Sequence, residues 1–207
     1  MGSLMPIAMY RNTAVGADLT LETPRLILRS FRLEDAEVVS KWLSTPRVSH
    51  GFLSRPGDRV QPSAADILHD YNGRSSILLI IQERKTFSAL GFFTLKTTPE
   101  SRSLWLSMAI GERSGLGRGL TEEAGQAVAN WAFSTKRFDR IEAIAAENNR
   151  LIAHILRLYM NDEGIVEGRS ELDFDGTSIS LRRYGLSKDQ WPAKSKTIAD
   201  NLALGQK

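Results

Sequence analysis

Short apolar runs alternate along the chain with longer stretches in which apolar residues recur at helical spacing. Strand-like runs occupy residues 25–31, 75–84, 89–98, 103–112, 140–147, 165–174 and 177–186. Helical spacing is found in residues 33–44, 62–71, 120–132 and 149–162. The predicted order, β-α-α-β-β-β-α-β-α-β-β, indicates an α/β protein with a mixed α+β sheet and helices on both faces.

The connections between these runs predict how the strands pair. Residues 85–88 and 99–102 are short enough for hairpins, which favours an antiparallel meander. A long helix joins the strand at 103–112 to the strand at 140–147, so we expect these two to be parallel, with a right-handed crossover. Asp175-Gly176 predicts the turn between the last two strands, and the Pro-, Gly- and Ser-rich residues 45–60 predict a loop.

Length and composition fit one domain, because 207 residues with 42% hydrophobic content can bury a sizeable core. We place the domain at residues 21–191, after an N-terminal extension (1–20) that is partly of vector origin and before a mobile or helical tail (192–207). The longest purely apolar run, residues 77–81, is far shorter than the ~20 residues that span a bilayer. With no secretory signal pattern either, we expect a soluble cytoplasmic monomer or homodimer without a membrane partner.

Several chemistries are disfavoured by composition. The chain has no cysteine, which excludes disulfides and thiolate catalysis, and its three histidines (His50, His69 and His154) are dispersed, so we expect no metal site. Its 27 Lys and Arg and 24 Asp and Glu are interspersed, with a net charge of +3. This pattern lacks the basic patch of a nucleic-acid binder, so no nucleic-acid partner is predicted.

The segment "GERSGLGRGLTEEAG" (residues 111–125) places Gly115, Gly117 and Gly119 at alternate positions just before a helix. The glycines could simply permit a tight turn. A phosphate-binding loop of the GxxxxGK[ST] type is excluded, since no Lys-Ser or Lys-Thr follows. A second interpretation is a dinucleotide-binding loop, because a strand precedes the glycines, a helix follows them and an acidic residue, Asp139, lies about 20 residues further on. The spacing, however, is G-x-G-x-G rather than the G-x-G-x-x-G of that motif.

A third interpretation is an anion cradle. Glycines let backbone N–H groups crowd together at a helix N-terminus, where the positive end of the dipole favours an anion, and Arg118 adds a charge. The segment "ENN" (residues 147–149) follows the next strand and would be a neighbour of this loop if the two strands are parallel.

Four segments carry a resemblance to a known family. "GLGRGLTEEA" resembles the pyrophosphate-binding motif of the GNAT superfamily of N-acetyltransferases. "LETPRLILRSFRLEDAEVVSKWL", "RIEAIAAENN" and "DGTSISLRRYGLSKDQW" are similar to the branch that includes the ribosomal-protein-alanine acetyltransferases. Together the matches extend from Leu21 to Trp191, in the order of that branch.

The resemblance implies a GNAT-like fold with acetyl-CoA as co-substrate, in a V-shaped gap where the fourth and fifth strands separate. It implies that backbone groups of Met108, Ala109 and Ile110 bind the pantetheine arm, together with Asn148 or Asn149. It further implies that the pyrophosphate is held by the backbone N–H groups of Gly115, Leu116, Gly117, Arg118, Gly119 and Leu120.

The chain also departs from the family pattern. Ser114 occupies a position that often holds Gln or Arg, and Leu151 or Ile152 occupies the usual serine position on the following helix. Gly164-Ile165 would be a late counterpart of a Gly-Phe pair, as if that helix had gained one turn.

For catalysis the resemblance implies direct attack of a primary amine, from a protein N-terminus or a small molecule, on the acetyl thioester. It also implies that Tyr159, on the helix where many relatives place a tyrosine, is the candidate proton donor to the thiolate. The alternative for Tyr159 is packing in the helix face. Glu112, acting through water, and His50 are the candidate bases, although both residue types are often simply solvated in loops. Two alternatives are a non-catalytic acyl-CoA-binding module of the same fold and a dinucleotide-dependent oxidoreductase.

Overall fold

The computed structural model describes residues 19–49, 66–67, 71, 76–97, 102–134, 138–172 and 178–204. The strands are β1 Thr20–Glu22, β2 Leu26–Ser30, β3 Ser76–Glu83, β4 Ala89–Thr97, β5 Ser103–Ile110, β6 Arg140–Ala146, β7 Asn161–Leu172 and β8 Ser178–Ser187. The α-helices are α1 Ala36–Ser44, α2 Pro46–Ser49, α4 Leu120–Ser134, α5 Arg150–Tyr159 and α6 Trp191–Leu204. Short 3₁₀ turns, η2 Leu33–Asp35 and η3 Arg113–Gly115, precede α1 and α4.

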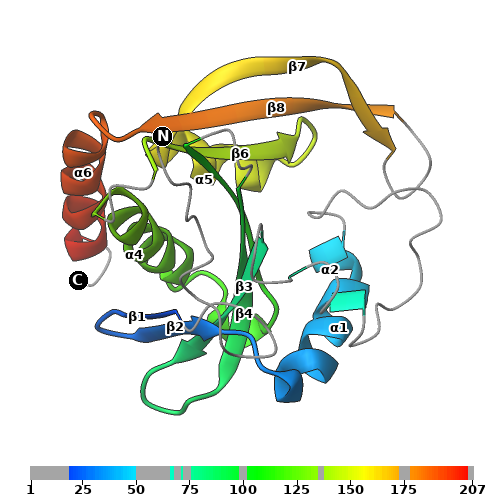
Figure 1. Ribbon diagram of the computed structural model, residues 1–207, viewed down its shortest axis with the longest axis vertical. Coiled ribbons are helices and arrows are strands. Elements are labelled where there is room, and N and C mark those ends of the chain that lie inside the picture. The colour runs from blue at the N-terminus through cyan, green and yellow to red at the C-terminus, as the bar shows by residue number, and fades with distance from the viewer. Residues whose placement is uncertain are drawn as a thin grey trace, which may run out of the picture.

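The eight strands form one mixed sheet in the order β1-β2-β3-β4-β5-β6-β8-β7. Strands β3, β4 and β5 form the predicted antiparallel meander. Strand β2 extends it by pairing antiparallel with β3, and β5 pairs with β6 in parallel. Figure 1 shows α1 and α2 on one side of the sheet and α4 and α6 on the other. The predicted fold class, with its single parallel pair, is therefore confirmed.

Two buried clusters, one on each face of the sheet, hold the layers together. In β3 the alternating side chains divide between them: Leu79 and Ile81 pack with α4, α5 and α6, whereas Leu78 and Ile80 pack with α1 and α2. This alternation explains why β3 is apolar throughout, since both of its faces are covered. On α4 the predicted stripe is confirmed by four fully buried residues, Leu120, Ala124, Val128 and Ala132.

Gly125 offers a direct test of the α4 assignment. It lies inside the helix, and a Cβ atom added there would have no neighbour within 4 Å. Because glycine in a helix interior is less favourable than alanine by about 0.8–1 kcal/mol, we expect Gly125→Ala to raise the free energy of unfolding by up to this amount. Urea denaturation would measure the change, and a loss of stability would contradict the helical placement of this residue.

Three elements differ from the sequence prediction. Strand β1 lies partly in the segment set aside as an extension, because Thr20 to Glu22 pair with β2 at the edge of the sheet. Helix α2 interrupts the predicted loop at 45–60, beginning at Pro46, a residue suited to the first turn of a helix. The helix predicted at 149–162 ends at Tyr159, because Asn161 and Asp162 pair with β8 instead.

The end of α5 also overturns the idea of an added helical turn. Gly164 lies within β7 with φ of 90°, at a shift in the register of pairing with β8. It therefore forms a strand irregularity that needs glycine, not a delayed helix terminus.

The C-terminal segment takes the helical alternative of the two that were predicted. Helix α6 buries Trp191 and Ile198 in the cluster that contains α4. The indole N–H of Trp191 donates to Asn130 Oδ1 at 2.9 Å, and its ring lies 6.0 Å from that of Phe133. The helix predicted at 62–71 lies outside the described residues except for three positions, and Asp175-Gly176 lies outside them entirely.

Candidate active site

Strands β5 and β6 separate part of the way along the sheet. They pair at three positions, ending with Trp105 opposite Glu142. Beyond that point β5 continues along β4 as far as Ile110, while β6 continues along β8 as far as Ala146. Two strand edges therefore face each other across a widening gap, the V shape that the family resemblance implies.

The backbone of β5 presents alternate residues to this gap. The Gly111 N–H donates to Leu90 O of β4 at 2.8 Å, whereas Ile110 O accepts from Arg47 Nη1 at 2.7 Å. Since the polar groups of successive strand residues point to opposite edges, those of Ile110 and Met108 point toward the gap and those of Ala109 toward β4. Two of the three predicted pantetheine residues thus lie on the open edge.

The glycine segment forms the loop between β5 and α4, at the wide end of the gap. Gly117 and Gly119 have φ of 68° and 67°, a left-handed conformation that L-residues with side chains seldom adopt. A Cβ atom on Gly115 would lie 2.9 Å from Ile110 Cγ2, so this glycine allows the loop to pack against the strand. The three glycines therefore serve conformation and close approach.

The predicted N–H donors of the loop fall into two groups, those already hydrogen-bonded within the loop and those that are free. Those of Gly115 and Leu116 are used within the loop, donating to Glu112 O at 3.2 Å and Arg113 O at 3.1 Å. Those of Gly117, Arg118 and Gly119 meet no acceptor in the described part of the chain, and Leu120 begins the first turn of α4, whose N–H groups have no helical partner. The free donors thus converge at one helix N-terminus.

An ion pair between distant residues fixes the loop from behind. Arg25 Nη1 donates to Arg118 O at 2.8 Å and Nη2 to Gly119 O at 3.3 Å. The same guanidinium donates from Nε to Glu123 Oε2 at 2.5 Å, and the Thr23 hydroxyl and Arg25 N–H donate to Glu123 Oε1. With its carbonyl oxygens held by Arg25, the loop is oriented so that its N–H groups are free.

Glu123 also makes stability depend on pH. Burial by itself would raise the pKa of its carboxyl, but the hydrogen bonds from Thr23 and Arg25 outweigh that effect and lower the pKa below the ordinary 4.5. A lowered pKa contributes stability that is present above the ordinary value and is lost as the pH falls through the pKa of the folded state. We expect Glu123→Gln to destabilise the protein at neutral pH and to flatten this acid-side loss.

Urea denaturation from pH 7 to acid pH would measure that difference. Glu37→Gln is the matched control, because Glu37 is exposed on α1 and has no hydrogen-bond partner in the described residues. If the Glu123→Gln curve runs parallel to that of the wild type across the whole range, the carboxylate does not hold the loop.

The Arg118 side chain is turned away from the free N–H groups. It donates from Nη2 to Glu83 Oε1 of β3 at 2.7 Å and from Nη1 to Ser114 O at 3.3 Å. The hydrogen bond from Arg118 to Glu83 lowers the pKa of the Glu83 carboxyl. In this conformation the guanidinium of Arg118 pairs with Glu83 and does not point toward the free N–H groups of the loop.

Glu112 lies just after the carboxyl end of β5 and is held by α1, which packs on the face of the sheet opposite to α4. Trp42 of α1, which is almost fully buried, donates from Nε1 to Glu112 Oε1 at 2.8 Å. Its ring stacks on Phe92 and lies so close to Gly111 that an added Cβ would come within 2.2 Å. Glu112 Oε2 has no partner in the described residues, so one carboxylate oxygen is anchored and the other is available.

Helix α5 carries the remaining candidates. Tyr159 is its last residue and is half-buried. Burial, and to a lesser extent the charge of Glu122, raises the pKa of its phenol, which is protonated at neutral pH even without this shift. Asn149 caps the helix, its Oδ1 accepting from Ile152 N–H at 3.2 Å, and Asn148 is exposed just before it. His50 lies outside the described residues.

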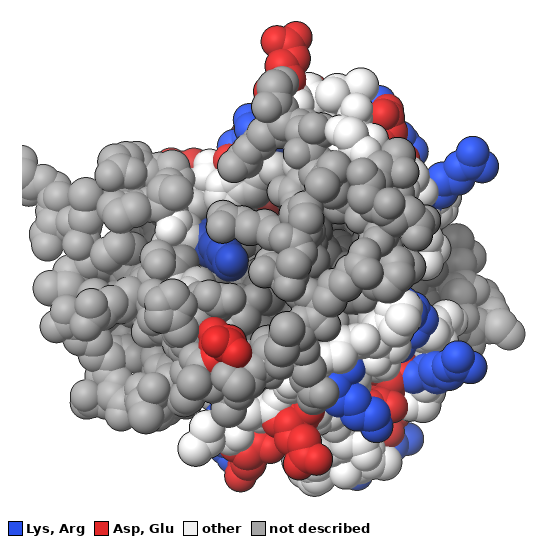
Figure 2. All heavy atoms as spheres, turned by 90° about the vertical axis from the view of Figure 1, so that its right-hand side faces the viewer, with Lys and Arg blue, Asp and Glu red and all other residues white. Residues whose placement is uncertain are grey.

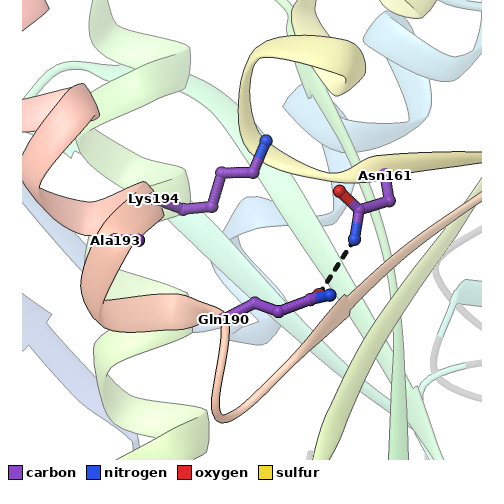
Figure 3. Close-up of a pocket in the computed structure, with 4 residues that line it drawn as sticks. All are labelled: Asn161, Gln190, Ala193 and Lys194. Atoms are coloured by element: carbon purple, nitrogen blue, oxygen red, sulfur yellow. Dashed lines mark hydrogen bonds between the residues drawn. The ribbon is translucent and has the colours of Figure 1, made fainter.

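Two surface features besides the gap are a pocket next to α6 and the charged side chains near α1 and α2. A shallow pocket lies between the start of β7 and α6, where Asn161 donates to Gln190 and Lys194 extends beside them (Figure 3). None of its lining residues belongs to β5, β6 or the glycine loop. Figure 2 shows the side of α1 and α2, where described acidic and basic side chains lie interspersed.

Two further features are absent from the described residues. No group of three His, Cys, Asp or Glu side chains among them is placed to hold a metal ion. None of the helices described is long and apolar enough to cross a membrane.

Known proteins share both the sequence pattern and the fold. A model of the acetyltransferase (GNAT) domain matches residues 25–158. An uncharacterized N-acetyltransferase, p20, from Bacillus licheniformis is 28% identical over 180 residues, covering 83% of this chain and 98% of the relative. The parting strands and the glycine loop at a helix N-terminus define a GNAT-type fold, and the chain belongs to the GNAT acetyltransferase family.

Solved structures agree on the fold. Mycobacterium smegmatis RimJ, solved in complex with CoA-disulfide, has a TM-score of 0.70 at 17% identity, covering 89% of this chain and 95% of that one. Spermidine N-acetyltransferase from Vibrio cholerae, solved with CoA and spermine, has a TM-score of 0.69 at 15% identity, covering 82% of this chain and 99% of that one.

Proposed function

We propose that this protein is an N-acetyltransferase that transfers an acetyl group from acetyl-CoA to a primary amine. The observation that carries the proposal is the set of free N–H donors at Gly117 to Leu120, which open onto the gap between β5 and β6. Donors converging on a helix N-terminus suit a pyrophosphate, and an unpaired strand edge suits the amide groups of a pantetheine arm. The CoA complexes of two structural neighbours support the same ligand.

In this proposal the ligand lies along the gap from the loop inward. The pyrophosphate accepts from the N–H groups of Gly117, Arg118, Gly119 and Leu120, while Gly115 and Leu116 shape the loop. The open-edge groups of Met108 and the N–H of Ile110 pair with the pantetheine arm, while Ile110 O keeps its hydrogen bond from Arg47. Asn149 can offer its side-chain amide to that arm because its oxygen is already engaged at the helix cap.

The reaction would join the amine nitrogen to the thioester carbonyl carbon and break the C–S bond, releasing the CoA thiol. An open-edge N–H of β5 can polarise the carbonyl oxygen. Glu112, anchored by Trp42, accepts the proton that the ammonium must lose, directly or through water. Tyr159, whose phenol is protonated at neutral pH, is the proposed donor to the departing thiolate.

Calorimetric titration tests the ligand assignment and separates it from the dinucleotide alternative. We expect CoA and acetyl-CoA to bind and NAD not to bind. The mostly antiparallel sheet already disfavours a dinucleotide domain, whose motif usually opens a parallel sheet. Binding of NAD without CoA would contradict the proposal, and CoA binding without turnover would favour the non-catalytic acyl-CoA module.

A further inference from the structure

The guanidinium of Arg183 is partly buried and pairs with no carboxylate in the described part of the chain. Arg183 lies on β8, and its guanidinium carbon sits 5.5 Å from the centre of the Trp105 ring. Its Nε is fully buried and has no hydrogen-bond partner among the described residues. Buried donors are nearly always satisfied, and no other nitrogen of this guanidinium donates to a described residue, so the group keeps its donors for an anionic ligand.

Neighbouring arginines are paired, which makes Arg183 distinct. Arg182 contacts both Asp162 and Glu147, at 2.9 and 3.1 Å. Arg140 pairs with Glu163, and it also lies 3.7 Å from Glu142, the buried acid of this face. Within the described residues, no carboxylate lies within ion-pair distance of Arg183.

The side chain of Arg183 lies close to the gap between β5 and β6. Arg183 is opposite Ile144 of β6, and Trp105 is the last residue of β5 that pairs with β6. The side chain therefore reaches across β6 to the point where β5 and β6 part, which in the proposed function is where the thioester meets the amine.

The neighbours of Arg183 and Trp105 along their strands show on which face of the sheet these two side chains lie. Leu104, Leu106 and Tyr184 pack in the cluster that contains α4. Because strand side chains alternate, Trp105 and Arg183 lie on the other face, where Trp42 anchors Glu112. A ligand group bound here approaches the gap from the side opposite the face on which α4 packs.

We propose that Arg183, supported by Trp105, binds a carboxylate of the acceptor, so that the substrate class is a primary amine that also carries a carboxylate. This inference rests on the proposed acetyl transfer. A guanidinium presents a planar pair of donors that matches a carboxylate, and the aromatic ring beneath it fixes the plane. The same positive charge repels polyamines, which have no anionic group to offer.

The carboxylate could belong to a small amino acid or to an acidic peptide, and matched acceptors distinguish the two. The small-molecule pair is an α-amino acid and its α-amide; the peptide pair is Ala-Glu-amide and Ala-Gln-amide; spermine is the cationic comparison. Thiol release from acetyl-CoA gives kcat/KM for each. We expect the acid of at least one pair to exceed its neutral counterpart roughly 10- to 100-fold, and spermine to be poor.

Arg183→Met is the decisive variant, because its apolar side chain still covers Trp105. We expect it to abolish the preference for the acid while leaving the KM for acetyl-CoA and the thermal stability close to wild type. Arg183→Lys, which keeps a charge but not the paired donors, should restore part of the preference. Equal use of acid and neutral acceptors by the wild type, or a preference that survives in Arg183→Met, would overturn the assignment.

Failure of this inference can be told apart from failure of acetyl transfer itself. Turnover without a carboxylate preference refutes the Arg183 site alone. If no acceptor is turned over, the four acceptors of the matched pairs are titrated calorimetrically into CoA-bound protein. Binding of the acids that is lost in Arg183→Met then supports the site, and absence of such binding refutes it.

Discussion

Gly117→Glu should abolish CoA binding, weakening it by at least about 100-fold. The residue has φ of 68°, and its own N–H and those of its neighbours are the free donors of the loop. A Cβ atom added here would have no neighbour within 4 Å, so a side chain would extend into the space in front of the loop. Its carboxylate would then repel the pyrophosphate, and the left-handed backbone would add about 1–2 kcal/mol of strain.

Calorimetry with CoA measures this loss, and Gly125→Glu is the matched control. Gly125 lies further along α4, where an added Cβ also has no neighbour within 4 Å. The control adds the same charge and should bind CoA with nearly wild-type affinity. Undiminished affinity in a folded Gly117→Glu protein would mean that the loop is not the pyrophosphate site.

Glu112→Gln should lower kcat by about 10²–10⁴-fold, the usual contribution of a general base, with a smaller change in the KM for acetyl-CoA. The substitution keeps an oxygen that can still accept from Trp42 Nε1, so the local packing should survive. Steady-state kinetics with the best acceptor would measure both constants. Wild-type kcat in this variant would place the base elsewhere.

Trp42→Phe separates the orientation of Glu112 from its chemistry. The smaller ring can still stack on Phe92 and pack under Gly111 but has no N–H to donate. We expect kcat to fall less than in Glu112→Gln, because the carboxylate remains but is no longer fixed. A larger fall than in Glu112→Gln would show that Trp42 acts mainly through the fold.

The sequence was most informative where the chemistry is local. Hydrophobic spacing predicted the individual strands and the α4 stripe, and alternate glycines marked the loop before α4. These patterns depend on residues close together in the chain, so they are visible without coordinates. The lengths of the connections then predicted the meander and the parallel pair.

Contacts between distant segments left no such pattern. Arg25 and Glu123 are 98 residues apart, and Trp42 and Glu112 are 70 apart, yet these pairs position the loop and the proposed base. The sequence places Arg25 at the start of a strand and Glu123 in a helix, with no signal that the two side chains meet. Their meeting depends on how β2 packs against α4, which is a property of the whole fold.

The end of α5 shows how tertiary pairing overrides a helical pattern. Residues 149–162 have continuous helical spacing and polar residues at the end, which predicted a helix through Asp162. Asn161 instead pairs with Gly185 of β8, and Asp162 contacts both Arg157 and Arg182. Strand pairing and these ion pairs favour an extended backbone from Met160 onward, a competition that spacing alone cannot resolve.

Acetyl transfer to an amine is tested most directly by incubating the protein with acetyl-CoA and the acceptor panel. Thiol release and the mass of the acceptor are followed together. The account predicts amine-dependent release of CoA thiol, matched by an acceptor that gains one acetyl group. If CoA binds but no acceptor gains an acetyl group and no thiol is released above the amine-free rate, the enzymatic account is contradicted.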